Sequence, residues 1–209
     1  MNVKIVRADI VIIAQAHNPS IISPQWIKDK LGVDDQPQQF VHTPDFSLFD
    51  CERLVILADR QRVQITAKKF DQINLEATAK VAKKYVTLLN HIPYRALGLN
   101  FLWRAESEDE ILSSKIAFRI GKIKDFSAVF PDHELMYGGI VIATKHPYIL
   151  KLTIEPQGRQ AISYTFNYHH ELEGMDTETI VSYINNFISL HLDSERIVRI
   201  TFVQEEKNA

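Results

Sequence analysis

The sequence predicts an α+β protein built on one mainly antiparallel, twisted sheet with helices packed on one face. Two amphipathic helices, over 74–89 and 179–192, carry this prediction together with a series of short stretches in which apolar residues recur at every second position. Each helix has one apolar stripe and needs an apolar surface to cover. A continuous sheet whose other face stays partly exposed supplies that surface for both helices.

The first third of the chain predicts a long strand, a short helix and four short strands. Residues 3–16 form the long strand, and its later part is apolar on both faces, as in the centre of a sheet. Ser23 is a good N-cap, Pro24 suits the first helical position, and Gly32 ends the helix. The short strands follow over 39–43, 46–49, 54–57 and 63–68, the last two as a hairpin.

The helix over 74–89 has the clearest periodicity in the chain. Its apolar residues recur at alternating steps of four and three, which places them on one side of a helix: Leu75, Ala79, Ala82, Val86 and Leu89. Pro93 cannot continue the helix. Beyond it, every second residue of 97–103 is large and apolar, which predicts a strand.

The second half of the chain predicts a similar order of elements. Ser107 can cap a helix that begins with acidic residues and that Gly121 ends. Three strands, the second amphipathic helix and a final strand follow, over 135–143, 148–154, 161–168, 179–192 and 196–206. Residues 205–209 form a polar tail.

The elements together predict a single domain over 1–209 that contains two pseudo-repeats, 1–94 and 95–204. Each repeat has the order strand, helix, three or so strands and helix, and the final strand follows the second repeat. The alternative is a chance similarity between two α+β halves.

An offset of 101 residues superposes the two halves of the pattern. Arg95 then falls on Arg196 and Phe101 on Phe202. This order of elements resembles the duplicated saddle of the TATA-box-binding protein and, more distantly, the helix-grip folds. The resemblance is one of topology, and it implies a shared sheet without implying any functional residue.

The composition is that of an ordinary soluble globular protein, with 45% hydrophobic residues, 24% charged residues and a formal net charge of −2. No apolar run approaches the length needed to span a bilayer. The run over 10–14 is short for a signal-peptide core. Cys51 is the only cysteine, so an internal disulfide is impossible. We therefore expect a soluble, cytoplasmic protein.

Basic residues concentrate in the first half, where residues 1–104 hold 14 Lys+Arg and 10 Asp+Glu, against 10 and 16 in 105–209. Within 53–84 the excess allows an alternative function, nucleic-acid binding through phosphate contacts. The residues that would carry it are Arg60, Arg62, Lys68, Lys69, Lys80, Lys83 and Lys84. Lysines on the wet side of an amphipathic helix are usually only solvated, and a nucleic-acid saddle would need both halves basic. Nucleic acid is therefore the less favoured partner.

A second alternative is an enzyme with a polar or metal site around His169, His170 and Glu171. Imidazoles and a carboxylate are good ligands for a divalent metal, and His133 with Glu134 could join them in space. However, adjacent residues of a strand point to opposite faces, so His169 and His170 do not bind one ion unless a bulge intervenes. A solvated strand end is the favoured interpretation of this cluster.

The remaining motifs indicate no catalytic centre. Cys51 lies between Asp50 and Glu52, whose charges disfavour a nucleophilic thiolate. The sequence has no glycine-rich phosphate loop and no Gly-x-Ser-x-Gly turn. We therefore assign no catalytic, cofactor-binding or metal-ligating residue and expect no cofactor.

The sequence favours a non-catalytic, intracellular binding protein that acts through the exposed face of its sheet or through an edge strand. The expected partner is another protein or a second copy of the chain, which would make a homo-oligomer. The identity of the partner, the oligomeric state and the biological role are left open by the sequence.

Overall fold

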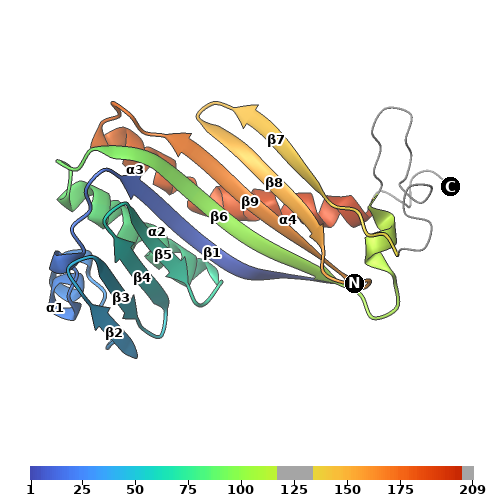
Figure 1. Cartoon of the computed structure of the whole chain (residues 1–209), viewed down its shortest axis with the longest axis horizontal. Helices are drawn as coiled ribbons and strands as arrows, with labels where there is room; N and C mark the ends of the chain where they lie inside the picture. Colours follow the sequence, from blue (N-terminus) through green and yellow to red (C-terminus); the bar gives the residue numbers. More distant parts are fainter. Residues whose placement is uncertain (117–133, 204–209) are drawn as a thin grey trace.

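The computed structural model describes residues 1–116 and 134–203, and within them nine strands form one sheet in which each pairing is antiparallel. The strand order is β2-β3-β4-β5-β1-β6-β9-β8-β7 (Figure 1). The strands are β1 (Asn2–Ala14), β2 (Gln39–His42), β3 (Phe46–Asp50), β4 (Leu54–Asp59), β5 (Arg62–Ala67), β6 (Tyr94–Glu106), β7 (Gly139–Lys145), β8 (Tyr148–Pro156) and β9 (Ala161–Glu171).

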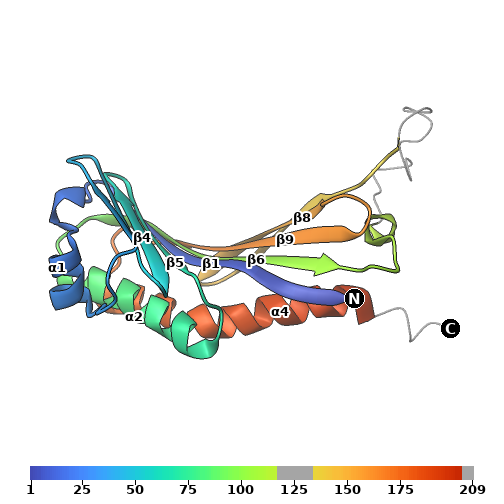
Figure 2. The same cartoon turned by 90° about the horizontal axis from the view of Figure 1, so that it is seen from below.

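The described helices pack against one face of this sheet (Figure 2). They are the 3₁₀ helix η1 (Pro19–Ile21), α1 (Pro24–Trp26), which continues into η2 (Ile27–Leu31), α2 (Gln72–Leu88), the 3₁₀ helix η3 (Leu112–Lys115), α3 (Thr177–Asn185) and α4 (Phe187–Val203). The predicted fold class, α+β with a mainly antiparallel twisted sheet and helices on one face, is confirmed. None of the described helices combines the length and apolarity needed to cross a membrane.

The two longest strands, β1 and β6, pair at the centre of the sheet. A register irregularity between Ile5 and Arg7 shifts the alternation by one residue. Because of this shift, Ile5 opposite Trp103 and Ala8 opposite Phe101 point to the same face although they are an odd number of residues apart. That face is the one the helices cover.

Helix α2 begins where Asp71 accepts a hydrogen bond from the backbone N–H of Asn74 at 3.0 Å, a normal N-cap contact. Its predicted apolar stripe is buried against β1 and β5. The short helix predicted after Ser23 is also present, as α1 and η2, and it ends at Gly32, whose φ of +72° favours glycine.

The predicted final strand over 196–206 is wrong, because residues 196–203 continue helix α4. Residues at helical spacing along α4 are buried: Phe187, Leu190, His191, Ser194 and Val198. The hydroxyl of Ser194 accepts a hydrogen bond from Trp103 Nε1 at 2.8 Å, which fastens the middle of the helix to β6. The packing of these residues against β6, which is distant in the sequence, therefore outweighs the strand-like alternation of apolar residues over 196–202.

This correction removes the proposed superposition at an offset of 101 residues, because Phe101 lies in a strand and Phe202 in a helix. The internal duplication is not confirmed and stays a prediction.

The helix predicted after Ser107 is present in the described residues only as η3, preceded by a turn in which Ser107 Oγ accepts from the Glu110 N–H at 3.2 Å. Residues 117–121 of that helix and the tail over 205–209 lie outside the described residues.

Replacing Phe101 by Ala should lower the free energy of unfolding by about 3–5 kcal/mol, because the ring is fully buried and a cavity would remain. Its ring lies 5.0 Å from that of Phe187 and 5.6 Å from that of His191, centroid to centroid. Urea denaturation would measure the loss. The matched control is Leu102→Ala on the opposite face of the same strand, where the side chain is half-buried and the cost should be clearly smaller. Equal losses would contradict the assignment of the core to the helix-covered face.

Candidate functional site

The sheet has one face opposite the helices, here called the open face, and two edge strands, β2 and β7, of which β7 is the longer. Figure 2 shows that the sheet rises at both ends, away from the helices, so that the open face is concave. Edges and uncovered faces are where sheet proteins bind partners. The sequence predicted binding through the exposed sheet face or through an edge strand, without specifying which strand forms the edge, and this stays a prediction.

A row of polar side chains crosses the middle of the open face. Asp9, Asn100, Asn167 and Lys151 lie directly opposite one another on β1, β6, β9 and β8, and Ile142 of β7 ends the row. Asn100 Nδ2 donates to Asp9 Oδ1 at 2.8 Å, and Asn167 Nδ2 donates to Asn100 Oδ1. The row therefore links the centre of the sheet to its β7 edge.

Asp9 is a carboxylate almost removed from water, with 1% of its surface exposed. Burial raises its pKa, and the hydrogen bond from Asn100 and the charge of Arg7 oppose the shift only in part. Arg7 Nε lies 3.0 Å from Asp9 Oδ2 in an ion pair, while Asn100 donates to the other carboxylate oxygen, Oδ1. The ion pair therefore compensates the buried charge only incompletely.

The other charges of the open face largely neutralise one another. Lys68 Nζ lies 2.6 Å from Asp50, Arg104 Nε lies 2.5 Å from Glu106, and Arg62 lies 3.5 Å from Asp59. A concave surface of this kind does not present the unpaired basic stripe that a phosphate backbone requires.

The β7 edge is apolar and exposed. The exposed fractions are 59% for Ile140, 50% for Val141 and 68% for Ile142. Ile140 and Ile142 point to the open face, beside Ile149 of β8, and Val141 points to the other face. One side of β7 pairs with β8, and no strand of residues 1–116 or 134–203 pairs with the other side. Its backbone groups on that side are available to another chain.

The structure brings together two of the three residues of the predicted polar site, His169 and Glu171, and separates the third, His170. His169 and His170 point to opposite faces of β9, as the alternation of a strand requires. On the open face, His169 Nε2 lies 2.8 Å from Glu171 Oε1, and both side chains are accessible. His170 is fully buried under α3. Glu134 pairs with Arg159 instead, and His133 lies outside the described residues.

His170 lies in an aromatic cluster between β9 and helix α3. Its ring stacks on Tyr183 at 4.6 Å between centroids and meets Tyr148 edge-on at 5.8 Å. Neither ring nitrogen has a hydrogen-bond partner of normal geometry among the described residues. Burial lowers the pKa of His170 to about 4, although the nearby Pro147 carbonyl opposes the shift. His170 is therefore neutral at physiological pH and serves packing.

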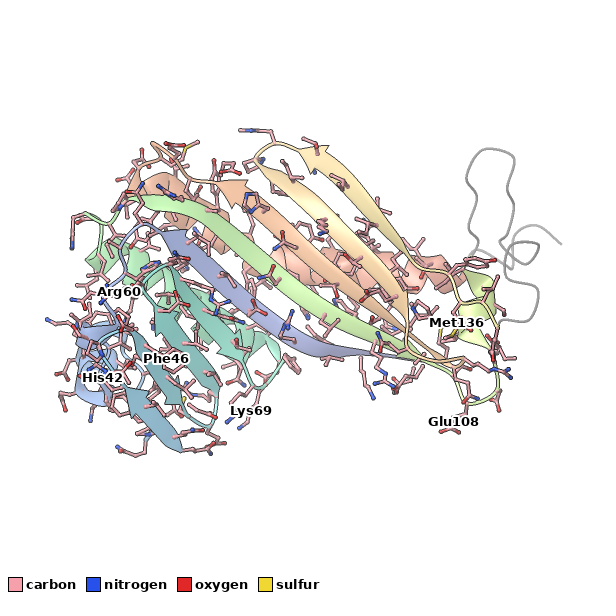
Figure 3. All side chains as sticks on the ribbon, viewed as in Figure 1. His42, Phe46, Arg60, Lys69, Glu108 and Met136 are labelled. Atoms are coloured by element: carbon pink, nitrogen blue, oxygen red, sulfur yellow. The ribbon has the colours of Figure 1, made fainter. Side chains whose placement is uncertain are left out.

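The predicted basic patch divides into two groups. Figure 3 places Arg60 and Lys69 at opposite ends of β5. The four residues of the hairpin face carboxylates: Arg60 with Asp45, Arg62 with Asp59, Lys68 with Asp50 and Lys69 with Glu52. Lys80, Lys83 and Lys84 lie apart from them on α2, and they line a groove together with Lys30 of η2.

The described residues hold no group of three or more His, Cys, Asp or Glu side chains arranged to bind a metal ion. Cys51 is fully buried and donates through Sγ to the carbonyl of Leu54 at 3.3 Å. Its position is that of a core residue, so solvent cannot reach the thiol.

Sequence reasoning missed three features of these surfaces: the buried Asp9, the end of the sheet at β7, and the approach of Lys30 to α2. Asp9 is a charged residue within an apolar stretch of the sequence, a pattern that indicates a buried polar group with a partner, so this feature could have been predicted. The other two depend on which segments become neighbours, and no local pattern carries that information.

His170→Phe should flatten the dependence of stability on pH between about 4 and 6.5. In that window the unfolded chain binds a proton at His170 and the native protein does not, so the wild-type protein gains stability as pH rises, by at most roughly 3 kcal/mol. Denaturation at several pH values would measure this gain. The control His169→Phe alters the accessible neighbour on the other face and should leave the slope unchanged. A slope unaltered in His170→Phe would show that the ring titrates normally.

Asp9→Asn should raise stability at neutral pH relative to the wild-type protein, with an advantage that shrinks as pH falls toward 3.8. The raised pKa of Asp9 means that the native state holds its proton more tightly than the unfolded state, so wild-type stability decreases as pH rises above that value. Asp176→Asn is the contrasting variant, because hydrogen bonds from Thr179 lower the pKa of that capping carboxylate. Its effect on the pH dependence should have the opposite sign, and equal signs would contradict the electrostatic assignment.

Neither the scan against protein-family models nor the search of curated proteins finds a match to this chain. The choice among functions therefore depends on the geometry of the open face, the β7 edge and the α2 surface.

Proposed function

We propose that this chain is a non-catalytic binding protein that docks a partner strand on its β7 edge, and that the partner is a second copy of the chain. The observation that carries the proposal is the exposed apolar strand of seven residues at the end of the sheet. Proteins usually protect such an edge with proline, bulges or charged side chains. β7 has none of these between Gly139 and Thr144, and its register with β8 is uninterrupted.

The strand is suited to pairing with itself. A two-fold axis through Ile142 pairs all seven residues antiparallel with those of the second copy. Ile142 then faces Ile142, Ile140 faces Thr144, and Val141 faces Ala143 on the other side of the sheet. Lys145 falls opposite Gly139, so the two lysines lie at opposite ends of the pair. No like charges meet within the paired strands.

The pairing would join the two open faces into one continuous surface. Ile140, Ile142 and Ile149 of each copy would lie on this surface, next to the dimer interface. Burial of these side chains supplies the driving force, and the backbone hydrogen bonds fix the register. One strand pair buries less area than a standard protein interface, so we expect a weak dimer that forms at micromolar or higher concentration. The second half of the chain is acidic, so moderate salt should favour the dimer by screening repulsion.

The opposite edge supports this role less well. β2 has four residues against the seven of β7, and Phe40 and Val41 are 37% and 38% exposed. An enzyme around His169, His170 and Glu171 is the weaker alternative, because the two histidines point to opposite faces of β9.

Ile142→Lys should abolish self-association, because the two-fold axis places two lysine side chains opposite each other. Sedimentation velocity of the whole protein over a range of micromolar concentrations would measure the monomer–dimer equilibrium. Ile73→Lys is the matched control: the same substitution at a side chain that is 77% exposed on α2 should leave association unchanged.

The register can be tested separately by mixing two variants. Ile142→Lys and Ile142→Glu should each be monomeric alone and should form a heterodimer when mixed, because opposite charges then face each other. A wild-type protein that stays strictly monomeric at high micromolar concentration would contradict the homodimer.

A further inference from the structure

A cluster of lysines lies on the helix side of the sheet. A shallow groove of ≈ 570 Å³ runs between η2 and the second half of α2. Its lining residues are Lys30, Lys80, Lys83, Lys84, Thr87 and Leu88. Four of these six side chains carry a positive charge, and no carboxylate of the described residues lines the groove.

The charge of the groove lysines is not neutralised by a direct ion pair with any described residue. Asp29 of η2 and Glu76 of α2 keep their negative charges close by in the chain, but each accepts a hydrogen bond from a neutral glutamine, Gln25 Nε2 and Gln72 Nε2 respectively, at 2.7 Å. Lys83 Nζ donates to the neutral Oδ1 of Asn185 at 2.9 Å. Within the part of the chain that the structure describes, Lys30, Lys80 and Lys84 form no ion pair.

This pattern differs from that of the basic residues on the β4–β5 hairpin. Each of those has a carboxylate within 3.5 Å, whereas the α2 lysines do not. Like charges gathered on one surface repel one another and destabilise the fold slightly unless an anion binds there. The arrangement therefore indicates an anionic ligand.

The backbone of η2 contributes to the shape of the groove. Gly32, which ends η2 in the left-handed region at φ +72°, lies so close to Lys84 Nζ that a Cβ at this position would collide with the ammonium group. The absence of a side chain at Gly32 thus lets Lys84 lie against the C-terminal end of η2, where the helix dipole favours a cation.

The lining also has an apolar component. Leu88 is one of the lining residues, and its side chain is 41% exposed. A ligand that fits must carry several negative charges and at least one apolar group. An acidic peptide with an interspersed hydrophobic residue has this chemistry.

Nucleic acid fits less well. No aromatic side chain lines the groove, so bases would find no stacking surface. A phosphate backbone would need a longer basic surface that also includes the basic residues of the hairpin. Those residues form ion pairs with carboxylates. We infer that the groove between η2 and α2 binds an acidic segment of a partner protein. This inference is independent of the β7 edge, which lies on a different part of the sheet.

The experiment measures fluorescence anisotropy of a labelled peptide that combines glutamates with one central leucine, titrated with the whole protein at low ionic strength. A peptide of the same length with glutamine in place of glutamate is the ligand control. We expect saturable binding of the acidic peptide and none of the glutamine peptide. Raising the salt concentration should weaken the binding, in contrast to the expected effect of salt on the β7 dimer.

The variant Lys80→Gln/Lys83→Gln should weaken binding by at least about fivefold, because glutamine keeps the helix and removes two charges from the groove. The double variant Lys4→Gln/Lys69→Gln removes the same net charge from two exposed ion pairs elsewhere and should weaken binding less than about twofold. Circular dichroism would verify that both proteins keep their helix content.

Three results would overturn the inference. The first is that the acidic peptide shows no saturable binding, and the second is that the two double variants lose peptide affinity equally. The third is that a single-stranded oligothymidylate of equal charge binds more tightly than the peptide, and that the Lys80→Gln/Lys83→Gln variant abolishes this binding. The last result would assign the groove to nucleic acid. Failure of the β7 dimer would leave this outcome unaffected, because Ile142→Lys should bind the peptide as the wild-type protein does.

Discussion

The structure depends on the antiparallel pairing of β1 with β6, which joins twelve residue pairs at the centre of the sheet. β1 also pairs with β5, and β6 also pairs with β9, so every other strand reaches the sheet through this pair. The residues that it presents to the helices are fully buried: Ala8, Ile10, Ile12, Leu97, Leu99 and Phe101. Helix α2 packs on β1 and β5, and α4 packs on β6 and β1, so the two long helices meet on the apolar face that the central pair creates.

Placing the helices on one face leaves two surfaces with different physical character. The β7 edge is apolar, and no strand of the described residues pairs with its outer side, which favours a strand as its partner. The groove between η2 and α2 is concave and cationic, and it favours an anionic segment. The separate locations allow both partners to bind at once, and salt should affect the two interactions in opposite directions.

The sheet also buries two titratable groups on its opposite faces, Asp9 toward the open face and His170 toward the helices. Burial disfavours the charged form of each, so it raises the pKa of the carboxyl group and lowers that of the imidazole. As pH rises through weakly acidic values, the histidine adds stability and the aspartate removes it. The two groups therefore act in opposite directions on the pH dependence of stability, and single variants separate their contributions.

Local patterns in the sequence were sufficient for the fold class, for helix α2 and for the short strands, because periodicity reports which side of an element is buried and caps report where a helix begins. The apolar residues of β1 change from odd positions, Val3 and Ile5, to even positions, Ala8 and Ile10. This change in the sequence matches the register irregularity between Ile5 and Arg7. Only the tertiary structure decided that residues 196–203 are helical, since burial against Trp103 and the rest of β6 outweighs the local alternation. The separation of His169 from His170 followed from the alternation of a strand. The candidate surfaces, by contrast, depend on neighbours far apart in the chain: the position of β7 at the edge and the approach of Lys30 to α2. A single sequence records which residues prefer to be buried, but the pairing of distant segments decides which of the remaining residues face a partner.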